Sequence, residues 1–349
     1  MTELIHCKIS LKKITPKNSK SGYSNSELKK LFGSTKINPD LVFSRAEFFQ
    51  QTKTKVQGMS ISGVQQKLSL KENERHELEA TTEDGEYILK PSPEAYPFAA
   101  ENEHTAMLIH QTVGIETALC GLVDFKGGEK DGEKGGERAY ITKRFDKLPD
   151  GSKQHQEDLL QCFDLPSKDK YSKTYEEAGL LLNKVTSGKQ AVTLEFVKRI
   201  IMAYAIGNDD MHLKNISVQK MSSNKGVHYD KLTPSYDNLL VEALSSTQKS
   251  KIGFLALGLL HDKEDGDEEF TDSYNYFGYY TGVDFIELAS RLGLKEKPVR
   301  KFISKLATDV KKLTDLVTHS FMPEEMKIAA QKIIESRINA LQKTDYTDS

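Results

Sequence analysis

Short runs in which hydrophobic and polar residues alternate occur along the chain from Met59 to Phe145. Such alternation is typical of strands, because successive side chains of a strand face opposite sides. The pattern predicts four strands, at residues 67–71, 87–90, 122–125 and 139–145. Between the second and the third, residues 101–113 place apolar side chains three and four positions apart, which predicts a helix. Together these elements predict a small antiparallel sheet with one amphipathic helix.

Beyond residue 150 the pattern follows a helical period. Apolar residues recur every three or four positions and predict helices at 157–163, 175–185, 194–206, 299–317 and from Pro323 to Leu341. The preceding residues, 1–58, show no strong period and are interpreted as a lead-in segment. The predicted fold is therefore α+β and bilobal. Its three parts are the lead-in (1–58), a β-rich N-lobe (59–147) and a helical C-lobe (148–349).

Composition excludes several classes of protein. The chain has 349 residues, with 49 Lys and Arg against 51 Asp and Glu, so a strongly basic surface for nucleic acid is not indicated. The longest apolar run, Ile252–Leu260, is half of the roughly 18 residues that a membrane span needs. The N-terminus lacks the cationic start and apolar core of a signal peptide, so the expected location is the cytoplasm.

The segment Gly207–Asn215 (GNDDMHLKN) follows the predicted helix 194–206 and concentrates groups that carry chemistry. A carboxylate such as Asp210 can deprotonate a hydroxyl, Lys214 can neutralise phosphate charge, and an Asn215 oxygen can bind magnesium. The spacing of five residues from Asp210 to Asn215 matches the catalytic loop of protein kinases. A polar helix end with a solvated turn remains the alternative interpretation of this segment.

Other motifs stand where a kinase would need them. Asp237 lies 22 residues beyond Asn215, the place of a second magnesium ligand, and Lys90 closes a predicted strand that precedes an acidic helix. Glu101 and Glu103 are both candidates for its ion-pair partner. Upstream, the segment SISGVQQK forms a Ser/Gly turn whose backbone N–H groups could cradle phosphate, although its single glycine fails the known phosphate-loop patterns.

Six motifs in order, SISGVQQK, YILKP, ENEHTAMLIHQTVGI, YITKRFDK, GNDDMHLKN and LTPSYDNLL, resemble the HipA family of bacterial toxin kinases. The resemblance implies a protein-kinase-like fold that uses ATP and Mg²⁺ to phosphorylate serine on a protein. Characterised members of this family act on aminoacyl-tRNA synthetases. They pair with a helix-turn-helix antitoxin, so contact with DNA would be indirect.

The resemblance also implies roles for individual residues. Asp210 would be the catalytic base, Lys90 would hold the α- and β-phosphates, and His212 and Lys214 would complete the catalytic loop. Asn215 and Asp237 would bind magnesium. The nucleotide-binding set would comprise Ser62, Gly63, Val64, Gln65, Gln66, Lys67, Lys90, the hinge residues Lys143, Arg144 and Phe145, and His212, Asn215 and Asp237. Ser60 or Ser62 would be autophosphorylated, which places charge beside the ATP phosphates and inactivates the kinase.

Two departures from the family qualify these expectations. Lys143 stands where the hinge usually carries an acidic residue, and only 59 residues precede Ser60. The chain therefore looks like the shortened, HipT-type kinase, whose missing N-terminal subdomain can be supplied by a separate small protein. Two alternatives stay open: a non-catalytic, kinase-shaped partner of an antitoxin and DNA, and a kinase for a small molecule.

Overall fold

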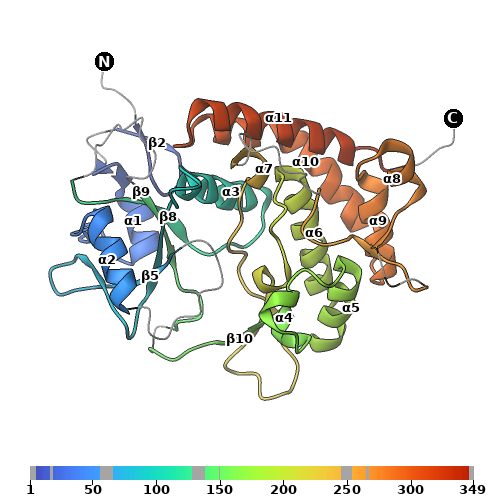
Figure 1. The fold of residues 1–349 in the computed structure, drawn as a ribbon, viewed down its shortest axis with the longest axis horizontal. Coiled ribbons are helices and arrows are strands. Elements are labelled where there is room, and N and C mark those ends of the chain that lie inside the picture. Colours follow the sequence, from blue (N-terminus) through green and yellow to red (C-terminus); the bar gives the residue numbers. More distant parts are fainter. Residues whose placement is uncertain are drawn as a thin grey trace.

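The computed structural model describes residues 5–15, 19–55, 66–127, 138–148, 150–244, 254–264, 266 and 268–345. A β-rich part built from the N-terminal half of the chain lies beside a helical part built from the C-terminal half (Figure 1). This arrangement agrees with the predicted α+β architecture.

A five-stranded sheet with antiparallel neighbours forms the centre of the β-rich part. Its strands, in spatial order, are β6 (Leu78–Ala80), β5 (Leu68–Glu72), β7 (Tyr87–Pro91), β9 (Arg138–Lys143) and β8 (Cys120–Asp124). Four of these strands coincide with the predicted ones, and every boundary agrees within two residues. The fifth, β6, is only three residues long and offers no alternation that a sequence pattern could register.

Side-chain alternation along β7 and β9 decides which residues face the helical part. Leu89 pairs with Ile141 and both join a core with the N-terminal helices, whereas Lys90 pairs with Tyr140 on the opposite face. That second face is covered by α3 (Ala99–Val113). A shift of one residue in register would turn Lys90 away from α3, so the sheet register itself positions this lysine.

The N-terminal residues pack on the first face of the sheet. Their described part contains four two-residue strands and two helices: β1 (Ile5–His6), β2 (Lys13–Ile14), β3 (Ser19–Lys20), β4 (Tyr23–Ser24), α1 (Asn25–Phe32) and α2 (Arg45–Lys55). Contact is so close that a Cβ added at Gly121 of β8 would lie 2.9 Å from Ile9 and 3.2 Å from Leu31. Phe48 and Tyr23 are fully buried. The segment interpreted as a lead-in thus contributes to the core of the β-rich part.

Helix α3 is buried along nearly its whole length, between the sheet and the C-terminal helices. His104 and His110 on this helix are both fully buried. Each ring bonds one main-chain oxygen, of Ile9 at 3.0 Å and of Ala106 at 2.9 Å. Packing is therefore the role that the structure supports for these histidines.

The helical part surrounds one buried helix, α6 (Gln190–Ile206), whose last seven residues are all fully inaccessible to solvent. The other helices are α4 (Leu159–Cys162), α5 (Tyr175–Val185), α7 (Val241–Leu244), α8 (Asp272–Phe277), α9 (Gly282–Arg291), α10 (Glu296–Thr318) and α11 (Glu324–Leu341). Figure 1 shows α11 crossing from this part toward α3. The predicted helices 175–185, 194–206 and 299–317 are confirmed, as is the one that follows Pro323.

The prediction of a helix over 157–163 is wrong for its first two residues, 157 and 158. Residues His155–Asp158 form β10, which pairs with β11 (Ser217–Lys220), and only Leu159–Cys162 form a helix. Strand β12 (Lys231–Leu232) completes this sheet, and β13 (Leu260–His261) pairs separately with β14 (Glu268–Glu269). The pairing partner of β10 lies about 60 residues away, so a local pattern could not reveal it.

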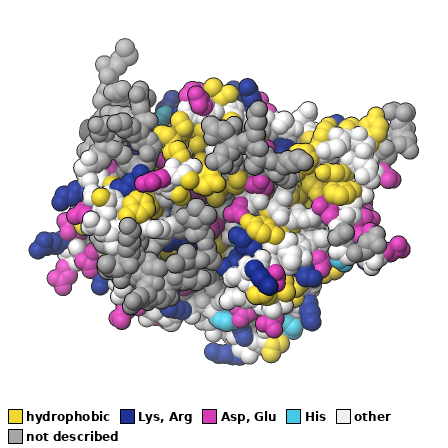
Figure 2. All heavy atoms as spheres, in the orientation of Figure 1, with side chains coloured by type: hydrophobic (Ala, Val, Ile, Leu, Met, Phe, Trp, Pro, Cys, Tyr) yellow, Lys and Arg dark blue, Asp and Glu magenta, His cyan; other side chains and the backbone are white. Residues whose placement is uncertain are grey.

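Among the described residues, no helix is long and apolar enough to cross a membrane. On the face drawn in Figure 2, basic and acidic side chains are interspersed over the residues that are coloured. This distribution agrees with the near-neutral net charge.

Candidate active site

Lys90 lies at the junction of the two parts, with its ammonium group between two carboxylates. Its Nζ lies 2.6 Å from Oε1 of Glu103 on α3 and also contacts Oδ1 of Asp237. Lys90 and Glu103 are buried. Of the two candidate partners for Lys90, Glu103 is the one that contacts it, whereas Glu101 lies 3.9 Å from Arg138.

The charges of this cluster stabilise one another against the cost of burial. Burial alone would lower the pKa of Lys90, but Asp237 and Glu103 outweigh it and raise the pKa above its ordinary value. Burial would likewise raise the pKa of Asp237, but Lys90 and Lys67 hold it well below its usual range. For Glu103 burial wins and raises the pKa to about 7. At neutral pH, Lys90 and Asp237 therefore form the charged pair.

Helix α3 also fixes the segment that carries Asp237. Asn102 donates from Nδ2 to the main-chain oxygen of Leu240 at 3.0 Å and accepts from the Leu240 N–H at 2.8 Å. On the other side of Asp237, the Tyr236 hydroxyl donates to the main-chain oxygen of Lys214 at 2.9 Å. Asp237 itself has φ of 58°, a left-handed conformation that is uncommon outside glycine. The carboxylate is therefore aimed by the backbone as well as by Lys90.

The catalytic-loop candidates begin where α6 ends. Gly207 closes α6 with φ of 67°, and its N–H bonds the main-chain oxygens of the last helical turn. The Asn215 amide then donates from Nδ2 to the main-chain oxygen of Asp210 at 2.8 Å, which closes the loop. Within it, Nε2 of His212 lies 3.7 Å from Oδ1 of Asp210. The Asp210 side chain is 42% exposed and so is open to a substrate.

Two further residues reach this loop that the sequence did not indicate. Lys170 donates from Nζ to Nε2 of His212 at 2.9 Å, and the Tyr171 hydroxyl donates to Oδ1 of Asp210 at 2.7 Å. Burial lowers the pKa of His212, with Asp210 opposing, so the ring is neutral at pH 7. Lys170 and Tyr171 belong to a polar stretch without a hydrophobic period. Tyr171 lies 39 residues before Asp210 in the sequence. No sequence signal could have found them.

Other predicted site residues lie around this centre in different ways. The Lys214 ammonium turns to Ser167 Oγ at 3.4 Å and forms no ion pair with a carboxylate in the described part of the chain. Lys67 lies 3.9 Å from Asp237. Ser60, Ser62, Gly63, Val64 and Gln65 lie outside the described residues, and Gln66 stands at their border.

Of the three hinge candidates, Lys143 is the last residue of β9, and Arg144 and Phe145 follow it. The Lys143 ammonium lies 5.9 Å from the centre of the Tyr87 ring, and Arg144 forms two hydrogen bonds with Asp146 at 2.6 and 3.0 Å. The ring of Phe145 packs 5.7 Å from that of Tyr236, next to Asp237. Of these three side chains, only that of Phe145 is shown to contact a residue adjacent to Asp237.

The donors in this centre fit a hard divalent cation such as Mg²⁺. Asp237 offers carboxylate oxygens, and Asn215, whose Nδ2 is used by Asp210, keeps its amide oxygen free of any hydrogen bond within the described part of the chain. Oxygen ligands of this kind, with few protein donors and room for phosphate oxygens, are what magnesium prefers. No cluster of three or more His, Cys, Asp or Glu side chains suited to a metal occurs among the described residues.

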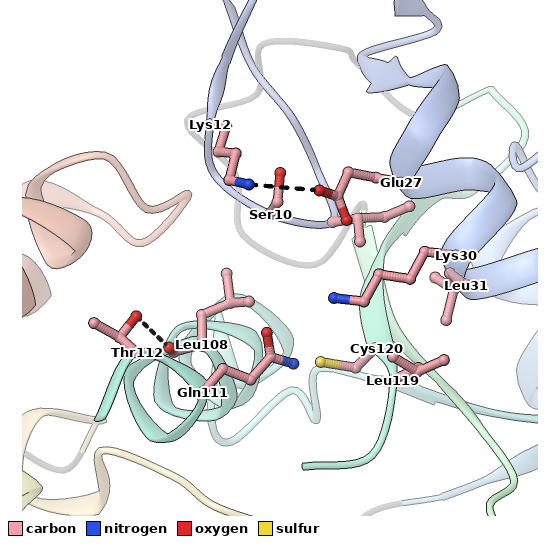
Figure 3. A pocket seen from close by; sticks show the side chains of 11 residues that line it. Ser10, Lys12, Glu27, Lys30, Leu31, Leu108, Gln111, Thr112, Leu119 and Cys120 are labelled. Atoms are coloured by element: carbon pink, nitrogen blue, oxygen red, sulfur yellow. Dashed lines mark hydrogen bonds and ion pairs between the residues drawn. The ribbon is translucent and has the colours of Figure 1, made fainter. Parts of the chain in front are cut away.

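A separate cavity of about 240 Å³, lined in part by the N-terminal residues Ile9, Ser10 and Lys12, contains none of these groups. It is enclosed by α1, by α3 and by the start of β8. Figure 3 shows Lys30, Gln111 and Cys120 pointing into it. The candidate active site is therefore distinct from this cavity.

Comparison with known proteins finds one matching family model and several similar sequences. A family model described as the HipA-like C-terminal domain matches residues 59–314. A protein of Haemophilus influenzae that bears the name "Putative kinase" is 36% identical over 329 residues, which cover 91% of this chain and 92% of that protein. The Sinorhizobium fredii protein Y4dM, also named as a kinase, is 33% identical over 197 residues, or 52% of this chain and 44% of its own length.

Two solved structures share the fold. HipA of Shewanella oneidensis, determined with HipB and operator DNA, superposes with a TM-score of 0.60 at 17% identity. The match covers 81% of this chain and 65% of that one. The kinase CtkA of Helicobacter pylori superposes with a TM-score of 0.50 at 15% identity, over 76% of this chain and 89% of that one. The predicted kinase-like, HipA-like fold is confirmed.

Proposed function

Because the chain belongs to the HipA-like C-terminal domain family, we propose that it is an ATP-dependent protein kinase that transfers the γ-phosphate to serine or threonine. The observation that carries this proposal is the ammonium of Lys90, buried between Glu103 and Asp237. A strand lysine paired with a helix glutamate, beside a metal-binding aspartate, is the arrangement that active protein kinases require.

In this proposal Asp210 is the general base that takes the proton of the acceptor hydroxyl. Asn215 holds the Asp210 main chain in place, and Lys90 binds the α- and β-phosphates once nucleotide separates it from Asp237. Mg²⁺, held by Asn215 and Asp237, would neutralise developing phosphate charge. Ser62, Gly63, Val64, Gln65, Gln66 and Lys67 would cover the phosphates, and Lys143, Arg144 and Phe145 would lie beside adenine. His212 and Lys214 would support the catalytic loop.

A protein acceptor is favoured over a small molecule because Asp210 is open to solvent. We propose further that the kinase is the toxin of a toxin–antitoxin system with a helix-turn-helix antitoxin, as the Shewanella neighbour was solved with HipB. DNA contact would then pass through the antitoxin, and an aminoacyl-tRNA synthetase is the candidate target. The same proposal includes a HipT-type organisation, in which a separate small protein is a partner. Its N-lobe ends at residue 147 and its C-lobe begins at residue 148.

Incubation of the purified protein with magnesium and ATP, followed by intact-mass and peptide mass spectrometry, tests the proposal. We expect phosphate on Ser60 or Ser62 in the wild type and none in Asp210→Ala. Asp210→Ala should still bind nucleotide, because Lys90 and Asp237 are intact. Absence of phosphate transfer, ADP formation and nucleotide binding in the wild type would instead favour a non-catalytic binding partner.

A further inference from the structure

The hydroxyl of Tyr171 takes the position on Asp210 that a substrate hydroxyl would need. A general base must lie within about 2.6–3.2 Å of the group that it deprotonates. Tyr171 Oη lies 2.7 Å from Oδ1 of Asp210. Oδ1 is also the oxygen 3.7 Å from His212, whose ring in turn interacts electrostatically with Asp237. The occupied oxygen is thus the one on the side of His212.

Tyr171 is held on the catalytic loop by a few local contacts. Its ring meets the His212 ring edge-on, with centroids 5.1 Å apart, and the Lys170 ammonium lies 4.8 Å from the Tyr171 centroid. Burial, followed by Asp210, raises the pKa of Tyr171, so the phenol keeps its proton and remains a donor. These contacts are sufficient to seat the hydroxyl.

The same residue can leave its position at low cost. Its side chain is 48% exposed and belongs to no core cluster in the described residues. The short segment that carries it is anchored on both sides, by the turn Ser167–Asp169 and by Thr174, which caps α5 through a reciprocal pair of hydrogen bonds with Glu177. Tyr171 can therefore swing outward while both anchors stay in place.

We propose that Tyr171 is a gate on the acceptor site: its hydroxyl occupies Asp210 in the resting protein, and an acceptor hydroxyl must displace it before phosphoryl transfer. This inference rests on the proposed role of Asp210 as general base. The hydroxyl keeps water and unsuitable acceptors off Oδ1, although the Asp210 side chain as a whole is 42% exposed. Tyr171 is thus a specificity-determining residue that separates phosphoryl transfer to protein from ATP hydrolysis.

Hydrolysis of ATP without added acceptor tests the gate, with water as the probe. Tyr171→Phe removes only the hydrogen bond, and Tyr171→Ala removes the ring too. We expect ADP formation to rise about threefold to tenfold in Tyr171→Phe, the range for the net contribution of a typical intramolecular hydrogen bond, and further in Tyr171→Ala. A merely structural role for Tyr171 would lower the rate instead. The matched control Tyr276→Phe, at a side chain 68% exposed on α8, should leave the rate unchanged.

The outcomes separate the gate from the kinase proposal. An active wild type whose rate is matched by both Tyr171 variants, or exceeds theirs, overturns the gate and leaves the kinase proposal standing. Phosphate found on Tyr171 itself also overturns the gate, because the hydroxyl would then be a substrate. If the wild type and both Tyr171 variants form no more ADP than Asp210→Ala, both proposals are overturned.

Discussion

Glu103 and Glu101 are buried two positions apart on α3, yet only Glu103 contacts Lys90. Burial raises the pKa of each to about 7, so an uncharged glutamine is tolerated in either place. Glu103→Gln does not leave Lys90 without a counter-ion, because Asp237 remains. We expect stability within about 1 kcal/mol of wild type for both variants.

Activity should separate the two substitutions. Glu103→Gln loosens the placement of Lys90, and misplacement of a phosphate-binding group lowers kcat/KM for ATP, here by about tenfold or more. Glu101→Gln should change it by less than about twofold. Steady-state ADP formation, with urea unfolding as a check of the fold, measures both. Equal losses in the two variants would show that α3 matters only as a buried helix.

At the scale of an element, the end of α6 determines where the catalytic loop starts. Gly207 combines a left-handed φ of 67° with tight surroundings, since an added Cβ would lie 3.1 Å from Glu242 and from Ile333. Gly188 has a similar φ of 69° but open space around it. We expect Gly188→Ala to cost about 1 kcal/mol from backbone strain alone, and Gly207→Ala at least about 1 kcal/mol more. Urea unfolding of the two variants should measure the difference, and equal costs would contradict the role of packing.

Helix α3 contributes a pH dependence of its own. Burial lowers the pKa of His110 from 6.5 to about 4. As pH falls, His110 is therefore protonated in the unfolded chain before it is protonated in the folded protein. This histidine should therefore remove about 2 kcal/mol of unfolding free energy between pH 7 and pH 5. Glu101 and Glu103, with pKa raised to about 7, act in the opposite direction, so comparison must be with a variant.

His110→Gln should lose this dependence. Its difference in unfolding free energy from wild type should shift by about 2 kcal/mol in its own favour between pH 7 and pH 5. Urea unfolding at both pH values measures the shift. His228→Gln, at an exposed position, is the matched control and should keep the wild-type dependence. If the difference in unfolding free energy between His110→Gln and wild type is the same at both pH values, burial does not lower the pKa of His110.

At the scale of the whole molecule, the N-terminal residues and the sheet share one core. Phe48 of α2 is fully buried in it, whereas Phe270 in the helical part is 39% exposed. We expect Phe48→Ala to cost about 3–5 kcal/mol and Phe270→Ala about 1 kcal/mol, because only the first leaves a cavity. Thermal or urea unfolding distinguishes the two, and similar costs would mean that α2 adds little to the core.

Sequence reasoning located what depends on local spacing. Strands β5, β7 and β9, helix α3 and the loop around Asp210 all follow from residue periods or motif spacing. It did not locate what depends on distant partners. Strand β10 exists because it pairs with β11, Tyr171 meets Asp210 across 39 residues, and the two-residue strands β1 to β4 are too short to display a period. The sequence also could not decide between Glu101 and Glu103 as the partner of Lys90, because the packing of α3 against the sheet determines which one contacts it.

The left-handed backbone at Asp237 restricts which mutations the position can accept. Aspartate and asparagine adopt this conformation more readily than other non-glycine residues, so Asp237→Asn keeps the main chain and removes the charge. The two residues also differ by a single nucleotide in their codons. If the activity were harmful to a growing cell, spontaneous suppressors should accumulate Asp237→Asn far more often than bulkier replacements, as full-length, folded and inactive protein.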